Sequence, residues 1–135
     1  MNKKIFVSLP VKDLENSKEF FNKLGYSFNH QFTDENAACM VISDDIYVML
    51  ITEDFFKTFT DKNIANAKNT TEVIICLNEE SCERVDQHID KATKAGGTEI
   101  REPQEYEYMY TRSFSDLDGH IWEIIWMNES AIIKT

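Results

Sequence analysis

Residues 116–126 of the chain, DLDGHIWEIIW, carry the pattern that decides the fold. The Asp-Gly pair in this stretch predicts a tight turn, because glycine tolerates the positive φ that such turns need. The alternation after the turn predicts a strand with Ile121, Glu123 and Ile125 on one face. A glutamate on a buried face needs a partner, a metal, a ligand or a proton. Glu123 is therefore the first candidate for a functional residue.

The rest of the chain repeats one order of elements. The hydrophobic periodicity predicts a strand at 5–11, a helix from Asp13 to Gly25, and strands at about 26–32, 37–43 and 46–52. The same order then returns as a strand at 72–78, a helix from Cys82 that Gly96 ends, and strands at about 98–102, 108–115 and 119–127.

This repeat predicts an α+β fold of two paired βαβββ modules, because each module leaves one sheet face uncovered. We expect one domain over 1–135, with module one at about 1–60, a linker at about 60–70 and module two at about 71–135. The two sheets are expected to form a concave cleft.

The composition limits the classes of partner. The chain has 135 residues and a net charge of −10, which argues against nucleic-acid binding and against an anionic membrane surface. Its three cysteines include no C-x-x-C pair, so neither a disulfide framework nor a structural zinc site is expected. Because there is no signal-peptide pattern and no apolar run near the roughly 20 residues of a membrane span, we expect a cytoplasmic protein.

Two motifs resemble those of a known superfamily. The stretch 9–25, LPVKDLENSKEFFNKLG, and the hairpin at 116–123 are similar to the opening and the final hairpin of vicinal-oxygen-chelate proteins. That superfamily includes glyoxalase I, bleomycin-resistance proteins and extradiol dioxygenases. The chain looks closest to an uncharacterised glyoxalase-like branch often labelled predicted lactoylglutathione lyase. The resemblance implies a small-molecule ligand, a lyase, isomerase or dioxygenase type of activity, and a homodimer.

The resemblance also implies where a metal would sit. Metal-dependent members take four ligands from the first and last strands of each module, and these positions fall here on Phe6, Met49, Glu72 and Glu123. A phenylalanine offers no ligand atom and a methionine only a soft one, whereas a catalytic divalent ion generally needs three or more N or O ligands. We therefore expect a degenerate metal site and assign no metal ligand and no cofactor. A divalent ion held by the two glutamates stays the alternative.

Glu72 and Glu123 are the expected catalytic residues. On the predicted fold they face each other across the cleft, where they could share a proton or grip a cationic or hydroxyl-bearing ligand. The alternative is that Glu72 lies in solvent at the start of its strand.

The expected ligand-binding residues come from both modules. In the first module they are Phe6, Ser8 and Met49. In the second they are Tyr108, Tyr110 and Arg112, which share one parity and would form an aromatic face with a cation. The alternatives for this strand are dimer contact and cross-strand packing, and a turn near 106–109 would break the pattern.

Three other side chains receive structural interpretations. His120 and Glu123 differ by three positions, so in a regular strand they point to opposite faces, which favours a turn-capping His120 over a metal ligand. His88 falls on the polar side of its helix and is expected to be solvated. Cys76 is expected to be a small buried hydrophobe.

Three functions remain open at this point. The first is a small-molecule enzyme of the vicinal-oxygen-chelate type, metal-free, with Glu123 as acid or base. The second is a binding or sequestering protein of the bleomycin-resistance kind. The third is a domain whose cleft is filled by Phe6, Met40 and Met49 and which performs no chemistry.

Overall fold

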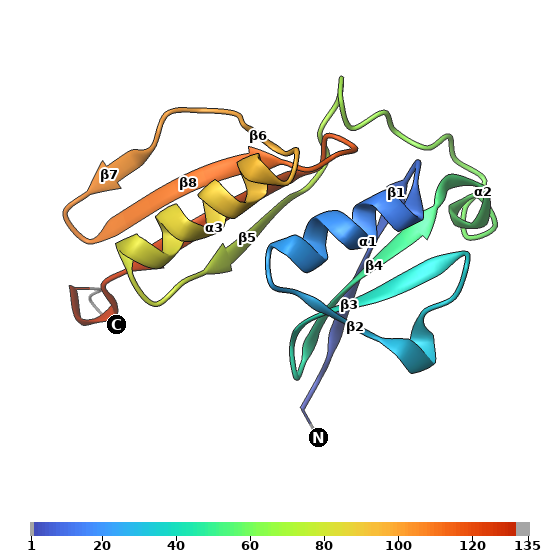
Figure 1. The fold of residues 1–135 in the computed structure, drawn as a ribbon, viewed down its shortest axis with the longest axis horizontal. Helices are drawn as coiled ribbons and strands as arrows, with labels where there is room; N and C mark the ends of the chain where they lie inside the picture. Colours follow the sequence, from blue (N-terminus) through green and yellow to red (C-terminus); the bar gives the residue numbers. More distant parts are fainter. Residues whose placement is uncertain (1, 132–135) are drawn as a thin grey trace. The chain divides into compact units, whose positions relative to one another are not determined.

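The computed structural model describes residues 2–131 and divides the chain into two compact units, Met1–Asn66 and Ala67–Thr135. Each unit has one mixed β-sheet, and one long helix lies along one face of that sheet (Figure 1). The predicted α+β fold of two βαβββ-like modules is confirmed. No helix among residues 2–131 is long and apolar enough to cross a lipid bilayer.

The first unit has a four-stranded sheet in the order β1-β4-β3-β2. Its elements are β1 (Ile5–Val11), α1 (Leu14–Lys23), β2 (Ser27–Asn29), the 3-10 turn η1 (His30–Phe32), β3 (Ala37–Ser43), β4 (Ile46–Thr52) and the short helix α2 (Glu53–Phe56). Strands β1 and β4 are parallel, and the other pairs are antiparallel.

Local chemistry sets the ends of α1 as predicted. Asp13 caps the helix, since its Oδ1 accepts a hydrogen bond from the Asn16 amide at 3.0 Å. Gly25 follows the helix with a φ of 102°, which a side chain would disfavour. The apolar face of α1 buries Phe20 and Phe21, as the 3.6-residue spacing requires.

The second unit has the sheet order β5-β9-β8-β6, with β7 paired to β8. Its elements are β5 (Ile74–Asn78), α3 (Cys82–Lys94), β6 (Thr98–Glu99), β7 (Gln104–Tyr106), β8 (Met109–Ser115), β9 (Ile121–Met127) and the 3-10 turn η2 (Glu129–Ala131). Strands β5 and β9 are parallel, whereas β8 runs antiparallel to β9.

Helix α3 covers one face of this sheet and leaves the other face without a helix of the unit. Val85, Ile89 and Ala92 of α3 are fully buried, and so are Phe114 and Ile124 in the sheet. Helix and sheet therefore share the core of the second unit. We call the face that α3 does not cover the open face.

Some predicted boundaries were wrong. The strand expected at 26–32 ends at Asn29, because the Asn29 side chain accepts a hydrogen bond from the Gln31 amide and starts a 3-10 turn. The strand expected at 98–102 has only the two residues of β6, and β7 was not predicted. The turn that would interrupt the tyrosine strand is present at residues 107–108.

Candidate functional site

Glu123 lies at the centre of the open face of the second sheet. The strand register pairs Glu123 of β9 with Cys76 of β5 on one side and with Ser113 of β8 on the other. Residues in register share a face of the sheet, so these side chains form a row across three neighbouring strands. We call this set, Cys76, Glu123 and Ser113, the Glu123 row.

The Glu123 carboxylate is half-buried and has no cationic partner among residues 2–131. Its one recorded hydrogen bond in that range comes from the Cys76 thiol, with Sγ 3.8 Å from Oε1. Partial desolvation of the Cys76 sulfur, although the residue as a whole is exposed, and then the negative charge of Glu123 raise the pKa of Cys76. The sulfur therefore stays a protonated donor at neutral pH, and the carboxylate keeps capacity to accept further hydrogen bonds.

Ser113 adds a second polar group whose hydrogen bonding is incomplete. The residue is 2% exposed, and its hydroxyl has no hydrogen-bond partner in the part of the chain that the structure describes. A buried hydroxyl without a partner costs about 1–3 kcal/mol.

A pocket of about 520 Å³ adjoins the Glu123 row on the same face. Ser115 and Ile121, which line it, lie two residues from Ser113 and Glu123, or about 7 Å along the strands. The other lining residues come from three separate segments: Ala67, Lys68, Asn69 and Thr71, then Gly96, Thr98 and Ile100, and the turn residues Asp116, Leu117 and Gly119.

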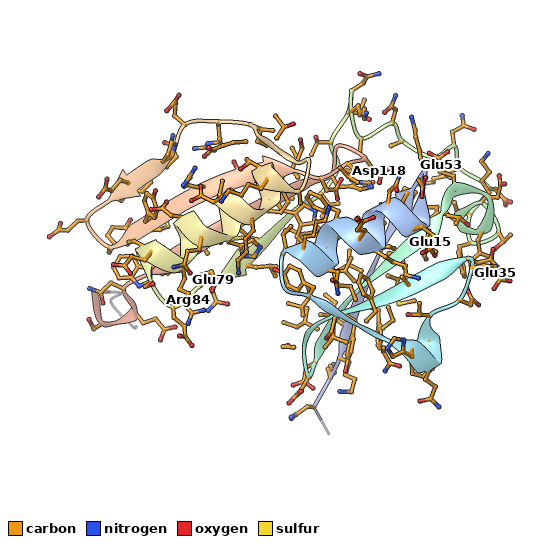
Figure 2. The ribbon with its side chains drawn as sticks, in the orientation of Figure 1. Glu15, Glu35, Glu53, Glu79, Arg84 and Asp118 are labelled. Carbon is orange, nitrogen blue, oxygen red and sulfur yellow. The ribbon has the colours of Figure 1, made fainter. Side chains whose placement is uncertain are left out.

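The turn between β8 and β9 is organised around the buried carboxylate of Asp116. Its oxygens accept hydrogen bonds from the Asp118 and His120 amides and from Trp122 Nε1, each at 3.0 Å. Burial raises the pKa of Asp116, while His120 and the three donors oppose that rise. Asp118, labelled in Figure 2, lies in this turn.

Gly119 lets the segment before β5 pack directly on the turn. Its φ is 95°, and a Cβ at this position would lie 2.9 Å from the carbonyl oxygen of Ala67 and from the amide nitrogen of Lys68. This close approach fixes one wall of the pocket, and only glycine permits it.

The structure does not bring Glu72 to Glu123. Glu72 is exposed and precedes β5, and the residue opposite Glu123 is Cys76. Glu72 lies in a bend two residues before β5 begins at Ile74, and four positions before Cys76. The strand register therefore pairs Glu123 with Cys76 and not with Glu72, which follows Thr71, a lining residue of the pocket.

Tyr110 and Arg112 lie on the opposite face, against α3. The Tyr110 hydroxyl donates to Asp86 Oδ1 at 2.7 Å, and burial, then this hydrogen bond, raise the pKa of Tyr110 to about 12. Arg112 binds both carboxylate oxygens of Glu99, at 2.8 and 2.9 Å, and Asp86 at 2.8 Å. The prediction that Tyr110 and Arg112 lie on the same face of their strand is correct, but α3 covers that face.

The expected aromatic face does not continue to Tyr108. This residue is in the turn at 107–108 between β7 and β8 and is 48% exposed. The turn interrupts the strand alternation, so Tyr108 is separated from both Tyr110 and the Glu123 row.

The three expected residues of the first unit do lie together. Phe6, Ser8 and Met49 are on the face of their sheet opposite α1, with Ser8 in register with Met49. The Phe6 ring stacks on Tyr47, with ring centroids 4.8 Å apart.

The interpretations of Cys76 and His88 were wrong. Cys76 is exposed, since it alternates with Ile75 and Leu77 and so faces away from α3. His88 is buried, and its Nδ1 lies 3.0 Å from Oε2 of Glu79, which Figure 2 labels below α3. The alternation of β5 was a signal for Cys76, and helical spacing was one for His88, which lies three residues after Val85 and four before Ala92 on the buried face of α3.

The donors around Glu123 do not fit the divalent metal that the sequence resemblance implies. Its neighbours in the row supply one thiol and one hydroxyl, whereas such an ion generally takes three or more N or O ligands. Residues 2–131 include no group of three or more His, Cys, Asp and Glu side chains placed to hold a metal.

Comparisons with known proteins support one family. Residues 3–43 match a family described as bleomycin resistance protein-like N-terminal. A hypothetical protein from S. aureus is similar in structure, with 29% identity, a TM-score of 0.79 and coverage of 93% of this chain and 94% of that chain. A search of curated proteins finds no match.

Two further solved structures share the fold. A glyoxalase/bleomycin resistance protein/dioxygenase family enzyme from Burkholderia phytofirmans is 15% identical, with a TM-score of 0.75 and coverage of 90% of this chain and 96% of that chain. The fosfomycin resistance protein FosX from Mesorhizobium loti is 16% identical, with a TM-score of 0.67 and coverage of 93% and 92%.

Proposed function

Because the chain belongs to the glyoxalase/bleomycin resistance/dioxygenase superfamily, we propose that it binds a small organic molecule at the Glu123 row. The observation that carries this proposal is the half-buried Glu123 carboxylate without a cationic partner among residues 2–131, beside a buried Ser113 hydroxyl that lacks a partner. The adjoining pocket of about 520 Å³ is within the size range of small-molecule sites.

The chemistry of the row defines what it can hold. A carboxylate accepts hydrogen bonds and favours a cationic donor. Hydrogen bonds to an ionised group are stronger than hydrogen bonds between neutral groups. The Ser113 hydroxyl can donate or accept, whereas the Cys76 thiol is already directed at Glu123. A ligand would therefore present a hydrogen-bond donor to Glu123.

A thermal-shift screen of small molecules, run with and without divalent metals, tests this function. Molecules that stabilise the wild-type protein should stabilise Glu123→Gln much less, since the neutral amide loses the charge-assisted bond. Glu83→Gln, an exposed substitution on α3, is the matched control and should respond like the wild type. Equal stabilisation of Glu123→Gln and the wild type would sink the proposal.

An enzymatic role is the second candidate. The Cys76 thiol and the Glu123 carboxylate put a proton donor and a proton acceptor next to one ligand position. In that case Glu123→Asp or Glu123→Gln should reduce turnover of a bound substrate by more than it reduces affinity. Loss of affinity alone would favour a binding or sequestering protein.

Residues outside the row complete the proposal. We infer that Glu72 contributes to ligand binding in the second unit and, as a separate proposal, that Phe6, Ser8 and Met49 bind a ligand on the face of the first unit's own sheet opposite α1. Glu72→Gln should weaken binding at the Glu123 row less than Glu123→Gln does, and Ser8→Ala and Met49→Ala should each weaken binding of any ligand that the first unit holds. A variant that leaves the affinity unchanged removes that residue from the site.

A further inference from the structure

The pocket beside the Glu123 row is lined by several polar side chains that carry no charge. They are Asn69, Thr71, Thr98 and Ser115. We propose that the ligand is an uncharged cyclic polyol, such as a monosaccharide or a cyclitol, whose hydroxyl groups bind these side chains and the Glu123 carboxylate. This inference rests on the proposed function and names the chemical class of its ligand.

The floor of the pocket is a row of side chains on the open face. Thr98 of β6 is in register with Ser115 of β8, and Ser115 is in register with Ile121 of β9. Residues in register point to the same side of a sheet, with their Cβ atoms about 5 Å apart. Ile121 shares that side with Glu123, because two positions separate them in one strand. The two hydroxyls and the carboxylate are therefore presented on one surface, in adjacent rows.

The uncharged polar side chains have capacity to bind a ligand. None of the four has a recorded side-chain hydrogen bond within residues 2–131. Asn69, Thr71 and Thr98 are exposed and Ser115 is partly exposed, so a ligand can reach them. A hydroxyl and an amide each donate and accept, as a polyol hydroxyl does. The lining can therefore pair with several hydroxyls of one molecule and leave no charge unbalanced.

The charged side chains of the lining are already engaged. Three donors at 3.0 Å surround the Asp116 carboxylate, and Lys68 takes part in another interaction. Glu123 and the net charge of −10 would also repel an anion. A polyol hydroxyl donates to Glu123 without a charge of its own, and a hydrogen bond to an ionised acceptor is stronger than one between neutral groups.

The apolar part of the lining favours a ring. Ile100, Leu117 and Ile121 line the same pocket. The C–H groups of a cyclic polyol form an apolar surface that can pack on aliphatic side chains while the hydroxyls meet the polar ones. The volume of about 520 Å³ is large enough for one such ring with its hydroxyls.

Probes that share one ring test the inference. We would titrate the protein by NMR with myo-inositol, cyclohexanol, cyclohexylamine and quinate, and with methyl β-D-glucopyranoside as a second uncharged polyol. At least one of the two uncharged polyols should bind at least tenfold more tightly than each of the other three probes, because only a polyol pairs with the whole lining. The better of the two polyols distinguishes a cyclitol from a sugar as the ligand.

Variants of the pocket floor test the same contacts. Thr98→Val keeps the shape and the strand preference of threonine, and both Thr98→Val and Ser115→Ala should weaken polyol binding severalfold. The matched controls are Thr93→Val, exposed on α3, and Ser43→Ala, exposed in the first unit, and both should bind like the wild type.

The outcomes separate failure of this inference from failure of the proposed function. No binding by either polyol, binding of cyclohexanol, cyclohexylamine or quinate as tight as that of the polyols, or unchanged polyol affinity in both floor variants would overturn the polyol ligand. If another molecule binds and loses affinity in Glu123→Gln, the proposed function stands and only the ligand class is wrong.

Discussion

The thiol of Cys76 and the carboxylate of Glu123 affect each other at the scale of single residues. Partial desolvation of the exposed residue's sulfur and the negative charge of Glu123 raise the pKa of Cys76, so little of the reactive thiolate forms at neutral pH. Cys82 is also exposed but is the first residue of α3, on the other side of the sheet. The two cysteines therefore provide a reporter and an internal control in one protein.

Alkylation by iodoacetamide at pH 8 should show this coupling. In Glu123→Gln the pKa of Cys76 falls, because the neighbouring charge is gone, and Cys76 should react severalfold faster than in the wild type. The rate at Cys82 should not change. Mass spectrometry of the labelled peptides gives both rates, and a slower reaction of Cys76 in the variant would contradict the assigned electrostatics.

His88 should make the stability of the protein depend on pH. Burial lowers the pKa of His88, an effect that Glu79 opposes and Lys91 adds to. Below about pH 6.5 the unfolded chain takes up a proton that the folded state resists, so the unfolding free energy should fall as the pH falls. The contribution of neutral His88 to the unfolding free energy is fully present above about pH 6.5 and is lost as the pH falls towards 5.

Urea unfolding of variants between pH 5 and 7.5 measures this contribution. His88→Gln should flatten the pH dependence, even though it lowers the overall stability. His30→Gln is the control, because His30 is exposed, and it should keep the wild-type slope. A slope unchanged by His88→Gln would assign the pH dependence to other groups.

At the scale of elements, local signals placed most helices and strands correctly. Asp13 and Gly25 mark the ends of α1 because capping depends on neighbouring backbone groups. The short elements were harder to predict. The two residues of β6 carry no periodicity of their own, and only their register with β8 makes them a strand.

The turn before β9 offers a test of how an element supports the site. Gly119 and Gly25 both have positive φ, but only Gly119 would bring a Cβ against another segment. Gly25→Ala should cost about 1–2 kcal/mol from backbone strain. Gly119→Ala should cost about 1–3 kcal/mol more, since residues 67–68 must shift.

The same pair of variants also tests the pocket. Gly119→Ala should weaken ligand binding as well as stability, because the shifted segment includes Lys68. Gly25→Ala should leave the affinity unchanged. Urea unfolding gives the unfolding free energy, and calorimetry gives the ligand affinity. Equal effects of the two substitutions would show that the packing of Gly119 against residues 67–68 does not support the pocket.

At the scale of the whole molecule, the chain divides into two units that each have a sheet and a core. Both tryptophans, Trp122 and Trp126, belong to the second unit. Tryptophan fluorescence therefore reports the unfolding of that unit, whereas far-UV circular dichroism reports both. We expect the two urea transitions to coincide, because units of this size are marginally stable alone and the sequence predicts one domain.

Two separate midpoints in that experiment would show two independently folding units instead. The expected homodimer is a separate proposal about the whole molecule, and sedimentation equilibrium tests it directly. A monomer over the micromolar range would reject it.

The sequence by itself determined which residues share a face. Alternation put Glu123 with Ile121 and Ile125, and it put Tyr110 with Arg112, because neighbouring side chains of a strand point to opposite sides. Capping and turn residues determined where several elements begin and end, since these depend on bonds between close neighbours.

Only the tertiary structure decided which face each set occupies. Helix α3 covers the side of Tyr110 and Arg112, so these residues bind Asp86 and Glu99, while Cys76 comes to Glu123. The pocket depends in the same way on three segments that are distant in the chain. The physical reason is that the two-residue period of a strand is local, whereas the choice of the covered face depends on how distant apolar side chains pack.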